Sequence, residues 1–153
     1  MVLLKAKAWF YIGIVPSKET KTGWQVIYFF KVSQNPIGKA VLDYFVERLE
    51  CGYIKANDKI GSTDQSLAYV VRDFRSLRDK VIPFFEGKLL IKRDAFNKFK
   101  QVIALIDRKK HFTHEGIKQI LEIAYSMNTG KRRVLQEEIL KAYMELESSQ
   151  AIR

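Results

Sequence analysis

The chain has few cysteines and no long apolar run, the features on which disulfide bonds, cysteine metal sites and membrane-spanning helices depend. Cys51 is its one cysteine, which excludes an intramolecular disulfide and a cysteine metal cluster within one chain. No apolar run approaches the roughly 20 residues of a membrane-spanning helix, and the apolar start, residues 1–8, is too short for a secretory signal. We therefore expect an intracellular protein that does not enter a membrane, in a mitochondrion, a plastid or the bacterial cytoplasm.

Acidic residues are scarce at the start of the chain. Residues 1–18 contain no Asp or Glu, and residues 1–40 contain six lysines but one acid, Glu19. The whole chain has 27 Lys and Arg against 17 Asp and Glu, a net charge of +10. Such an excess favours an anionic partner, nucleic acid first. The partner surface is expected to start in this N-terminal segment.

Several enzyme motifs are missing as well. The sequence contains no G-x-S-x-G nucleophile elbow and no Walker or dinucleotide glycine pattern. His111 and His114 do not form a set that completes tetrahedral metal coordination, so we interpret this stretch as a helix cap made by Thr113. The basic runs 108–110 and 131–133 leave two interpretations open, phosphate contacts or solvated helix ends.

Two hairpins are predicted from the apolar residues that are present. Aromatic and β-branched residues gather in two segments, 8–16 and 24–34, on either side of the polar stretch 17–23. This pattern predicts a long β-hairpin. Alternation of apolar and polar residues returns at 52–55 and 67–71, joined by a turn-rich stretch, and predicts a second hairpin.

Between and after the hairpins the apolar spacing is helical. Pro36 stands at the first position of a helix that we expect to run to about Glu50 and to pack on the first hairpin. The predicted fold class is α+β, a mixed four-stranded sheet in ββαββ order with helices on one face and extra C-terminal helices. A single domain is expected over 1–153, with a core of about 1–130 and a C-terminal helix at 131–153. The further helices are expected near 74–85, 93–108, 114–127 and 132–147.

Several strings in this order of elements resemble the single-motif LAGLIDADG homing endonucleases over about residues 2–133. The resemblance implies a DNA-cleaving family in which a helix delivers an acid from its C-terminal end to a divalent metal between the two scissile phosphates. It also implies that alternate residues of the four strands form a saddle that reads bases in the major groove. The strings are AWFYIGI at 8–14, YFFKVSQ at 28–34, LRDKVIPFF at 77–85, KRDAF at 92–96, HEGI at 114–117 and SMNTGKR at 126–132.

The sequence departs from the family at the acids of the motif. Read back from Trp9, the two acidic positions fall on Lys5 and Lys7, and Lys7 occupies the metal-ligand position. Mg²⁺ requires oxygen ligands, usually carboxylates, whereas an ammonium group repels the ion and pairs with phosphate. We therefore expect no catalytic residue and no metal, with Mg²⁺ only if the chain is an endonuclease after all. The motif helix is also short at Met1, so the usual homodimer of the family is not expected.

The family's accessory catalytic positions correspond to Gln34, to Lys39, which is offset by one from Gly38, and to Lys92. The saddle positions are unusually apolar, which argues against conventional reading of a duplex and suits stacking on unpaired RNA bases or an apolar protein neighbour. A slip of one residue in the register would turn these residues into the core. The saddle positions are Tyr11, Gly13, Val15, Gln25, Ile27, Phe29, Lys31, Ser33, Tyr53, Lys55, Ala68, Val70 and Arg72.

The sequence favours a non-catalytic protein that binds structured RNA as a maturase-like or ribosome-associated component. The alternative is an endonuclease that cleaves double-stranded DNA with a divalent metal, and a third class is a structural protein within a ribonucleoprotein. The side chains expected to contact nucleic acid are Lys5, Lys7, Lys18, Lys21, Gln25, Lys31, Lys39, Lys55, Arg72 and Lys92.

Overall fold

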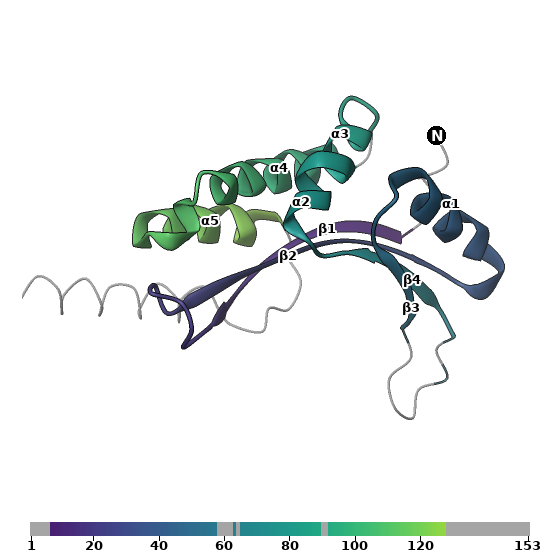
Figure 1. Ribbon diagram of the computed structural model, residues 1–153, viewed down its shortest axis with the longest axis horizontal. Helices are drawn as coiled ribbons and strands as arrows, with labels where there is room; N and C mark the ends of the chain where they lie inside the picture. The colour runs from purple at the N-terminus through teal and green to yellow at the C-terminus, as the bar shows by residue number, and fades with distance from the viewer. Residues whose placement is uncertain (1–6, 58–62, 64, 90–91, 128–153) are drawn as a thin grey trace, which may run out of the picture.

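A four-stranded sheet in the order β1-β2-β4-β3 carries helices on one face (Figure 1). The structure is a computed structural model that describes residues 7–57, 63, 65–89 and 92–127, with Lys7 described by its backbone alone. The long hairpin consists of β1 (Lys7–Pro16) and β2 (Trp24–Gln34), and the short one of β3 (Tyr53–Ala56) and β4 (Leu67–Val71). Both predicted hairpins and the α+β class in ββαββ order are confirmed.

The sheet is antiparallel throughout, which corrects the expected mixed sheet. The helical connection between the hairpins does make β2 and β3 run in the same direction. However, β4 lies between them, so these two strands exchange no hydrogen bonds. Every ladder in the sheet is therefore of the antiparallel kind.

The strand register divides the sheet into a core face and an outer face. Phe10 lies opposite Phe30, and Val32 lies opposite Tyr69; all four side chains are buried. Because successive side chains of a strand point to opposite faces, the residues one step away form the other face. The predicted saddle positions lie on that outer face, which confirms the predicted register, although Ala68 and Val70 are fully buried there.

The first helix begins later than predicted. Asn35 accepts a hydrogen bond at its Oδ1 from the Gly38 amide at 3.1 Å, and this cap forms a short 3₁₀ turn, Pro36–Gly38. The α-helix α1 (Lys39–Leu49) follows and ends at Glu50, which has a left-handed backbone with φ of 54°. The helix packs on the sheet as predicted, through its buried residues Leu42, Phe45 and Leu49.

The predicted helix over 74–85 is divided into three short pieces. They are α2 (Phe74–Ser76), a π-helical turn (Leu77–Val81) and α3 (Ile82–Phe85). Pro83 has no amide hydrogen to donate to the carbonyl four residues earlier, so the regular ladder is interrupted at this point. The later helices, α4 (Arg93–Asp107) and α5 (His114–Met127), lie close to the predicted bounds.

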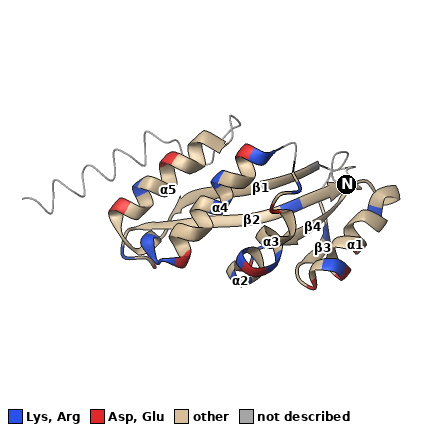
Figure 2. Cartoon of the chain, turned by 90° about the horizontal axis from the view of Figure 1, so that it is seen from above, with Lys and Arg blue, Asp and Glu red and all other residues tan. Residues whose placement is uncertain are grey.

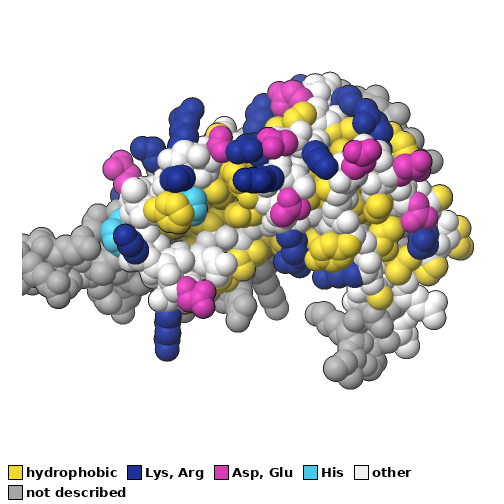
Figure 3. All heavy atoms as spheres, in the orientation of Figure 1, with side chains coloured by type: hydrophobic (Ala, Val, Ile, Leu, Met, Phe, Trp, Pro, Cys, Tyr) yellow, Lys and Arg dark blue, Asp and Glu magenta, His cyan; other side chains and the backbone are white. Residues whose placement is uncertain are grey.

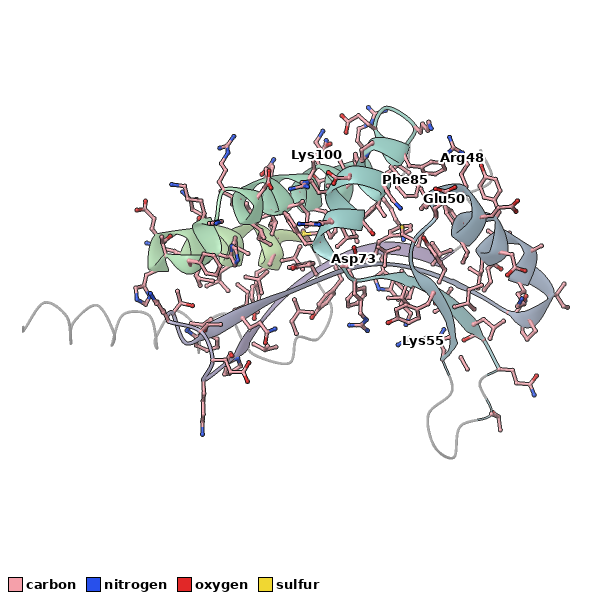
Figure 4. All side chains as sticks on the ribbon, in the orientation of Figure 1. Arg48, Glu50, Lys55, Asp73, Phe85 and Lys100 are labelled. Atoms are coloured by element: carbon pink, nitrogen blue, oxygen red, sulfur yellow. The ribbon has the colours of Figure 1, made fainter. Side chains whose placement is uncertain are left out.

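Aromatic rings join the sheet to the helical layer. The ring centroid of Phe10 lies 5.0 Å from that of Phe30, 5.6 Å from Phe85, 5.3 Å from Phe96 and 5.3 Å from Phe99. Figure 4 labels Phe85 in the helical layer, above the sheet. Among the described residues, no helix combines the length and the apolar character of a membrane span.

Parts of the sequence prediction lie outside the described residues. These parts are the motif segment 1–6 with Lys5, the helix expected at 132–147 and the basic run 131–133. The expectation that the usual homodimer does not form depends on the motif segment and stays a prediction, as does the expected cellular location.

Candidate nucleic-acid interface

The outer face of the sheet, which we call the strand face, is concave in Figure 1. It lies on the opposite side of the sheet from the helical layer, and Figure 4 shows Lys55 projecting from that side. The described side chains of the strand face are Trp9, Tyr11, Gly13, Val15, Gln25, Ile27, Phe29, Lys31, Ser33, Tyr53, Lys55, Ala68, Val70 and Arg72.

One row of side chains crosses the strand face from β1 to β3. The rings of Tyr11 and Phe29 are stacked with centroids 4.7 Å apart and 15° between their planes. The Arg72 guanidinium lies 5.1 Å from the Phe29 ring, and its Nε donates a hydrogen bond to the Tyr53 hydroxyl at 3.1 Å. Stacked rings and a cation over a ring are both favourable contacts, so the row holds its side chains in place.

Gly13 lets the first ring of this row adopt its position. A Cβ atom added at Gly13 would lie 2.7 Å from Cε1 of Tyr11, too close for any other residue without a shift. The Tyr11 side chain therefore leans along β1 over the glycine. The glycine therefore leaves the room that the Tyr11 ring of the stack occupies.

A second row contains Trp9, which was missing from the predicted saddle positions. Trp9 lies opposite Lys31, and the Lys31 Nζ lies 5.2 Å from the centre of its ring. Lys31 is in turn opposite Val70, and Val70 is opposite Tyr53. The alternation of β1 could have identified Trp9, because it lies two residues before Tyr11 and so shares its face.

The strand face concentrates positive charge. Burial lowers the pKa of Lys31, and the neighbouring charges of Lys55 and Arg72 lower it further. None of the four described strands contains Asp or Glu. Asp73 follows Arg72 directly, but its carboxylate accepts a hydrogen bond from the Ser76 amide at 3.0 Å, at the start of α2. An anionic ligand would relieve the mutual repulsion of these cations.

The helical layer has a different electrostatic character. Arg78 pairs with Asp79 at 2.7 Å and with Asp107 at 2.8 Å, and Lys100 pairs with Glu86 at 2.8 Å. Figure 2 shows basic and acidic residues alternating along these helices, and Figure 3 shows basic and acidic side chains intermingled on the surface above the sheet. Exposed pairs of this kind stabilise a fold little, but they do neutralise much of the local field.

Not all of the predicted contact residues lie on the strand face. Lys18 and Lys21 are exposed in the turn between β1 and β2, whereas Gln25 is exposed on the strand face close to that turn. Lys39 lies in α1, where its Nζ pairs with the Asp43 carboxylate at 3.1 Å. Lys92 precedes α4 with a left-handed backbone, φ 65°, and belongs to the helical layer.

The accessory positions also have a local structural explanation. Gln34 is the last residue of β2, and a Cβ atom added at Gly38 would collide with its Oε1. A basic side chain at position 38 would therefore require Gln34 to move, whereas the Lys39 side chain is exposed and pairs with Asp43. Lys7 begins β1 with its backbone opposite Ser33.

The described residues do not fit the divalent metal that the family resemblance implies. β1 contains no carboxylate from Lys7 to Pro16, and no group of three or more His, Cys, Asp or Glu within the described part of the chain could hold a metal ion. Thr113 caps α5 as predicted, since its Oγ1 accepts a hydrogen bond from the Gly116 amide at 3.0 Å. His111 packs against Phe112, with ring centroids 4.0 Å apart.

The chain is similar in sequence to a known family and to two curated proteins. The LAGLIDADG endonuclease family model matches residues 3–103. The probable intron-encoded endonuclease 2 of Neurospora crassa is 34% identical over 139 residues, covering 86% of this chain and 29% of that protein. The probable intron-encoded endonuclease 3 of the same organism is 27% identical over 137 residues, covering 89% and 25%. The chain thus spans less than a third of either curated relative.

Solved structures share the fold. The homing endonuclease I-TnaI has a TM-score of 0.73 and 33% identity, covering 90% of this chain and 88% of its own. I-LtrWI bound to target DNA has a TM-score of 0.72 and 30% identity, covering 80% and 40%. I-SmaMI bound to uncleavable DNA has a TM-score of 0.74 and 26% identity, covering 81% and 42%. From its sequence and its fold, this chain belongs to the LAGLIDADG endonuclease family.

Proposed function

We propose that this chain binds double-stranded DNA through the strand face. The observation that carries the proposal is the charge of this face, where the charges of Lys55 and Arg72 act on Lys31 and the four strands contain no acid. Duplex DNA presents a phosphate charge about every 1.7 Å along its axis, so a concave cationic sheet has an extended anionic surface to meet. Two solved relatives, I-LtrWI and I-SmaMI, hold DNA.

Duplex DNA is favoured over structured RNA. The RNA and ribosome roles expected from the sequence gain no support from the relatives, which are named endonucleases. Binding of RNA, as a maturase-like or ribosome-associated component, stays a prediction. The family relationship supports the alternative that the sequence offered, a LAGLIDADG homing endonuclease that cleaves double-stranded DNA with a divalent metal, better than it supports an RNA-binding role.

The proposed activity is binding without cleavage by this chain's own residues. Lys5 and Lys7 stand at the acidic positions of the motif, and carboxylates are the usual protein ligands of Mg²⁺. DNA cleavage is the second candidate function. The observation in its favour is that both curated relatives are named endonucleases.

Competition binding tests the target. A labelled DNA duplex is displaced from the chain by unlabelled duplex DNA, by an RNA hairpin or by single-stranded DNA of equal length at one salt concentration. We expect duplex DNA to be the strongest competitor. Stronger competition by the RNA hairpin would overturn the proposal and support the RNA prediction instead.

A cleavage assay with Mg²⁺ or Mn²⁺ tests the second candidate. Duplexes selected for tight binding are incubated with the unaltered chain and with a variant that restores two acids, Lys5→Asp with Lys7→Glu. We expect no specific double-strand cut by the unaltered chain. Such a cut would show that carboxylates outside the motif positions supply the metal site.

A further inference from the structure

The hairpin end of the strand face offers apolar contact surface next to one amide. Val15, Ile27 and Phe29 are partly exposed there, and Gln25 is exposed. Val15 lies opposite Gln25, and Ile27 lies opposite Gly13, which has no side chain. The apolar groups and the Gln25 amide therefore lie side by side on the two strands, and the Tyr11 ring occupies the space over Gly13 beside Ile27.

The Phe29 ring has no free face for stacking on a base. Tyr11, on β1, stacks on Phe29 with centroids 4.7 Å apart, and the Arg72 guanidinium lies 5.1 Å from the ring. These two partners come from opposite sides of β2, because β1 and β4 flank it. Both faces of the ring are covered, so Phe29 presents its edge. An edge suits apolar contact and does not suit a stacking platform for unpaired bases.

The major groove of DNA offers one apolar group to such side chains. Each base pair displays hydrogen-bonding atoms there, but only thymine adds a methyl group, at C5. Apolar side chains make no hydrogen bonds and so distinguish base pairs chiefly by that methyl. An amide such as that of Gln25 can pair with N6 and N7 of adenine, the partner of thymine. Both kinds of side chain therefore favour the same base pair.

We propose that Val15, Ile27 and Phe29 read thymine methyl groups in duplex DNA, with Gln25 beside them reading adenine, so that the chain selects sites rich in T·A pairs at this position. This inference rests on the proposed binding of duplex DNA. The cations Lys31, Lys55 and Arg72 supply binding to phosphate without sequence preference, and the hairpin end supplies the choice of sequence.

The DNA side of the contact gives the sharpest test. Sites are first selected by the whole chain from a pool of random duplexes, and T·A pairs are expected at adjacent positions. Each thymine is then replaced by deoxyuridine, which removes the methyl group alone. We expect about fourfold weaker binding for each contacted methyl, from the loss of one buried methyl group.

The protein side supplies a matched pair of variants. Ile27→Ala is expected to abolish the response to deoxyuridine at one position while duplex binding remains. Ile37→Ala is the control, since Ile37 is 95% exposed in the turn before α1, and it should leave the response unchanged.

Three results would overturn the inference. If the chain binds thymine and deoxyuridine sites equally, or if the sites that it selects contain no thymine, the inference is overturned but the proposed binding of duplex DNA stands. If deoxyuridine weakens binding equally for Ile27→Ala and for the unaltered chain, Ile27 does not contact the methyl group. Failure to bind any duplex at low salt would overturn the proposed function and this inference together. The deoxyuridine comparison needs no protein variant, so it decides even if Ile27→Ala does not fold.

Discussion

Lys31 stands at the centre of the strand face, and its surroundings lower its pKa. Burial is the main cause, followed by the charges of Lys55 and Arg72. In the unfolded chain the pKa returns to the ordinary lysine value, so between the two values the unfolded state binds more protons. Stability should therefore rise as the pH rises through this window. At neutral pH Lys31 is charged in both states, and the repulsion destabilises the free protein.

We expect Lys31→Met to raise the melting temperature of the free protein while weakening its binding to duplex DNA. The gain in stability should stay below about 1 kcal/mol, since the side chain is only partly buried. Thermal unfolding at neutral pH, with and without duplex, measures both effects. Lys118→Met, on the exposed side of α5, should change neither quantity. A lower melting temperature together with unchanged binding would contradict this account of Lys31.

Tyr69 joins β4 to the segment that follows α1. The residue is fully buried, and its hydroxyl donates a hydrogen bond to the Cys51 carbonyl at 2.8 Å. Burial, followed by the contact with the Cys51 thiol, whose Sγ lies 3.7 Å from the hydroxyl, raises the pKa of Tyr69, so the hydroxyl remains a donor at any ordinary pH.

Tyr69→Phe should lower the free energy of unfolding by about 1–3 kcal/mol, because the Cys51 carbonyl loses its partner. Urea unfolding measures the change. Tyr44→Phe serves as the control, since Tyr44 is 52% exposed. A loss no larger than that of Tyr44→Phe would show that the hydrogen bond contributes nothing to stability.

The sequence predicts which side of the sheet a strand residue faces better than it predicts which side chains are in contact. The alternation of the strands predicts which residues share the strand face, because side-chain direction follows the backbone period. It does not predict that Lys39 pairs with Asp43 or that Arg72 lies over Phe29. Such contacts depend on rotamers and on neighbours that are distant in sequence.

At the scale of elements, the turn between α1 and β3 depends on Gly52. Its backbone has a φ of 79°, and a Cβ atom there would lie 2.7 Å from the Val70 carbonyl oxygen. Gly87 has a similar φ of 74°, but a Cβ atom at that position would meet nothing within 4 Å. The two glycines therefore separate the effect of backbone strain from the effect of close packing.

Gly87→Ala should cost about 1–2 kcal/mol, the strain of a left-handed backbone. Gly52→Ala should cost a further 1–3 kcal/mol or so, because the backbone of β4 has to move. Denaturant unfolding of both variants measures the difference. Equal losses would mean that β4 accommodates the added methyl group, against the packing described here.

Element boundaries show where sequence patterns stop being informative. The hairpins were predicted closely, because aromatic and β-branched residues alternate over many positions. The predicted start of α1 is three residues too early, because the Asn35 cap first forms a 3₁₀ turn. The expected mixed sheet was wrong because the pairing of β2 with β4 is a long-range contact, which local periodicity does not encode.

At the scale of the molecule, charge is divided between two layers. The helical layer carries ion pairs such as Lys98 with Asp94 at 3.0 Å, whereas the strands contain no acid. The net charge of +10 predicted an anionic partner, and the spacing of strand residues predicted the face. Whether that partner is duplex DNA or RNA depends on how side chains pack within the strand face, which composition does not reveal.

The salt dependence of duplex binding tests the central claim most directly. One triple variant replaces Lys31, Lys55 and Arg72 with Gln on the strand face. A matched triple replaces Arg48, Lys88 and Lys118 with Gln, all exposed and on or beside helices. Affinity is measured over a range of salt concentrations for both variants and for the unaltered chain.

Affinity for DNA decreases as salt increases, so the slope of log affinity against log salt is negative. If DNA lies on the strand face, this slope should be less steep by about 2–3 in the strand-face triple, since each lost phosphate contact removes about 0.9 from its magnitude. The matched triple should keep the slope of the unaltered chain. Equal slopes in the two triples, or a larger loss in the matched triple, would contradict the assignment of the strand face as the DNA-binding surface.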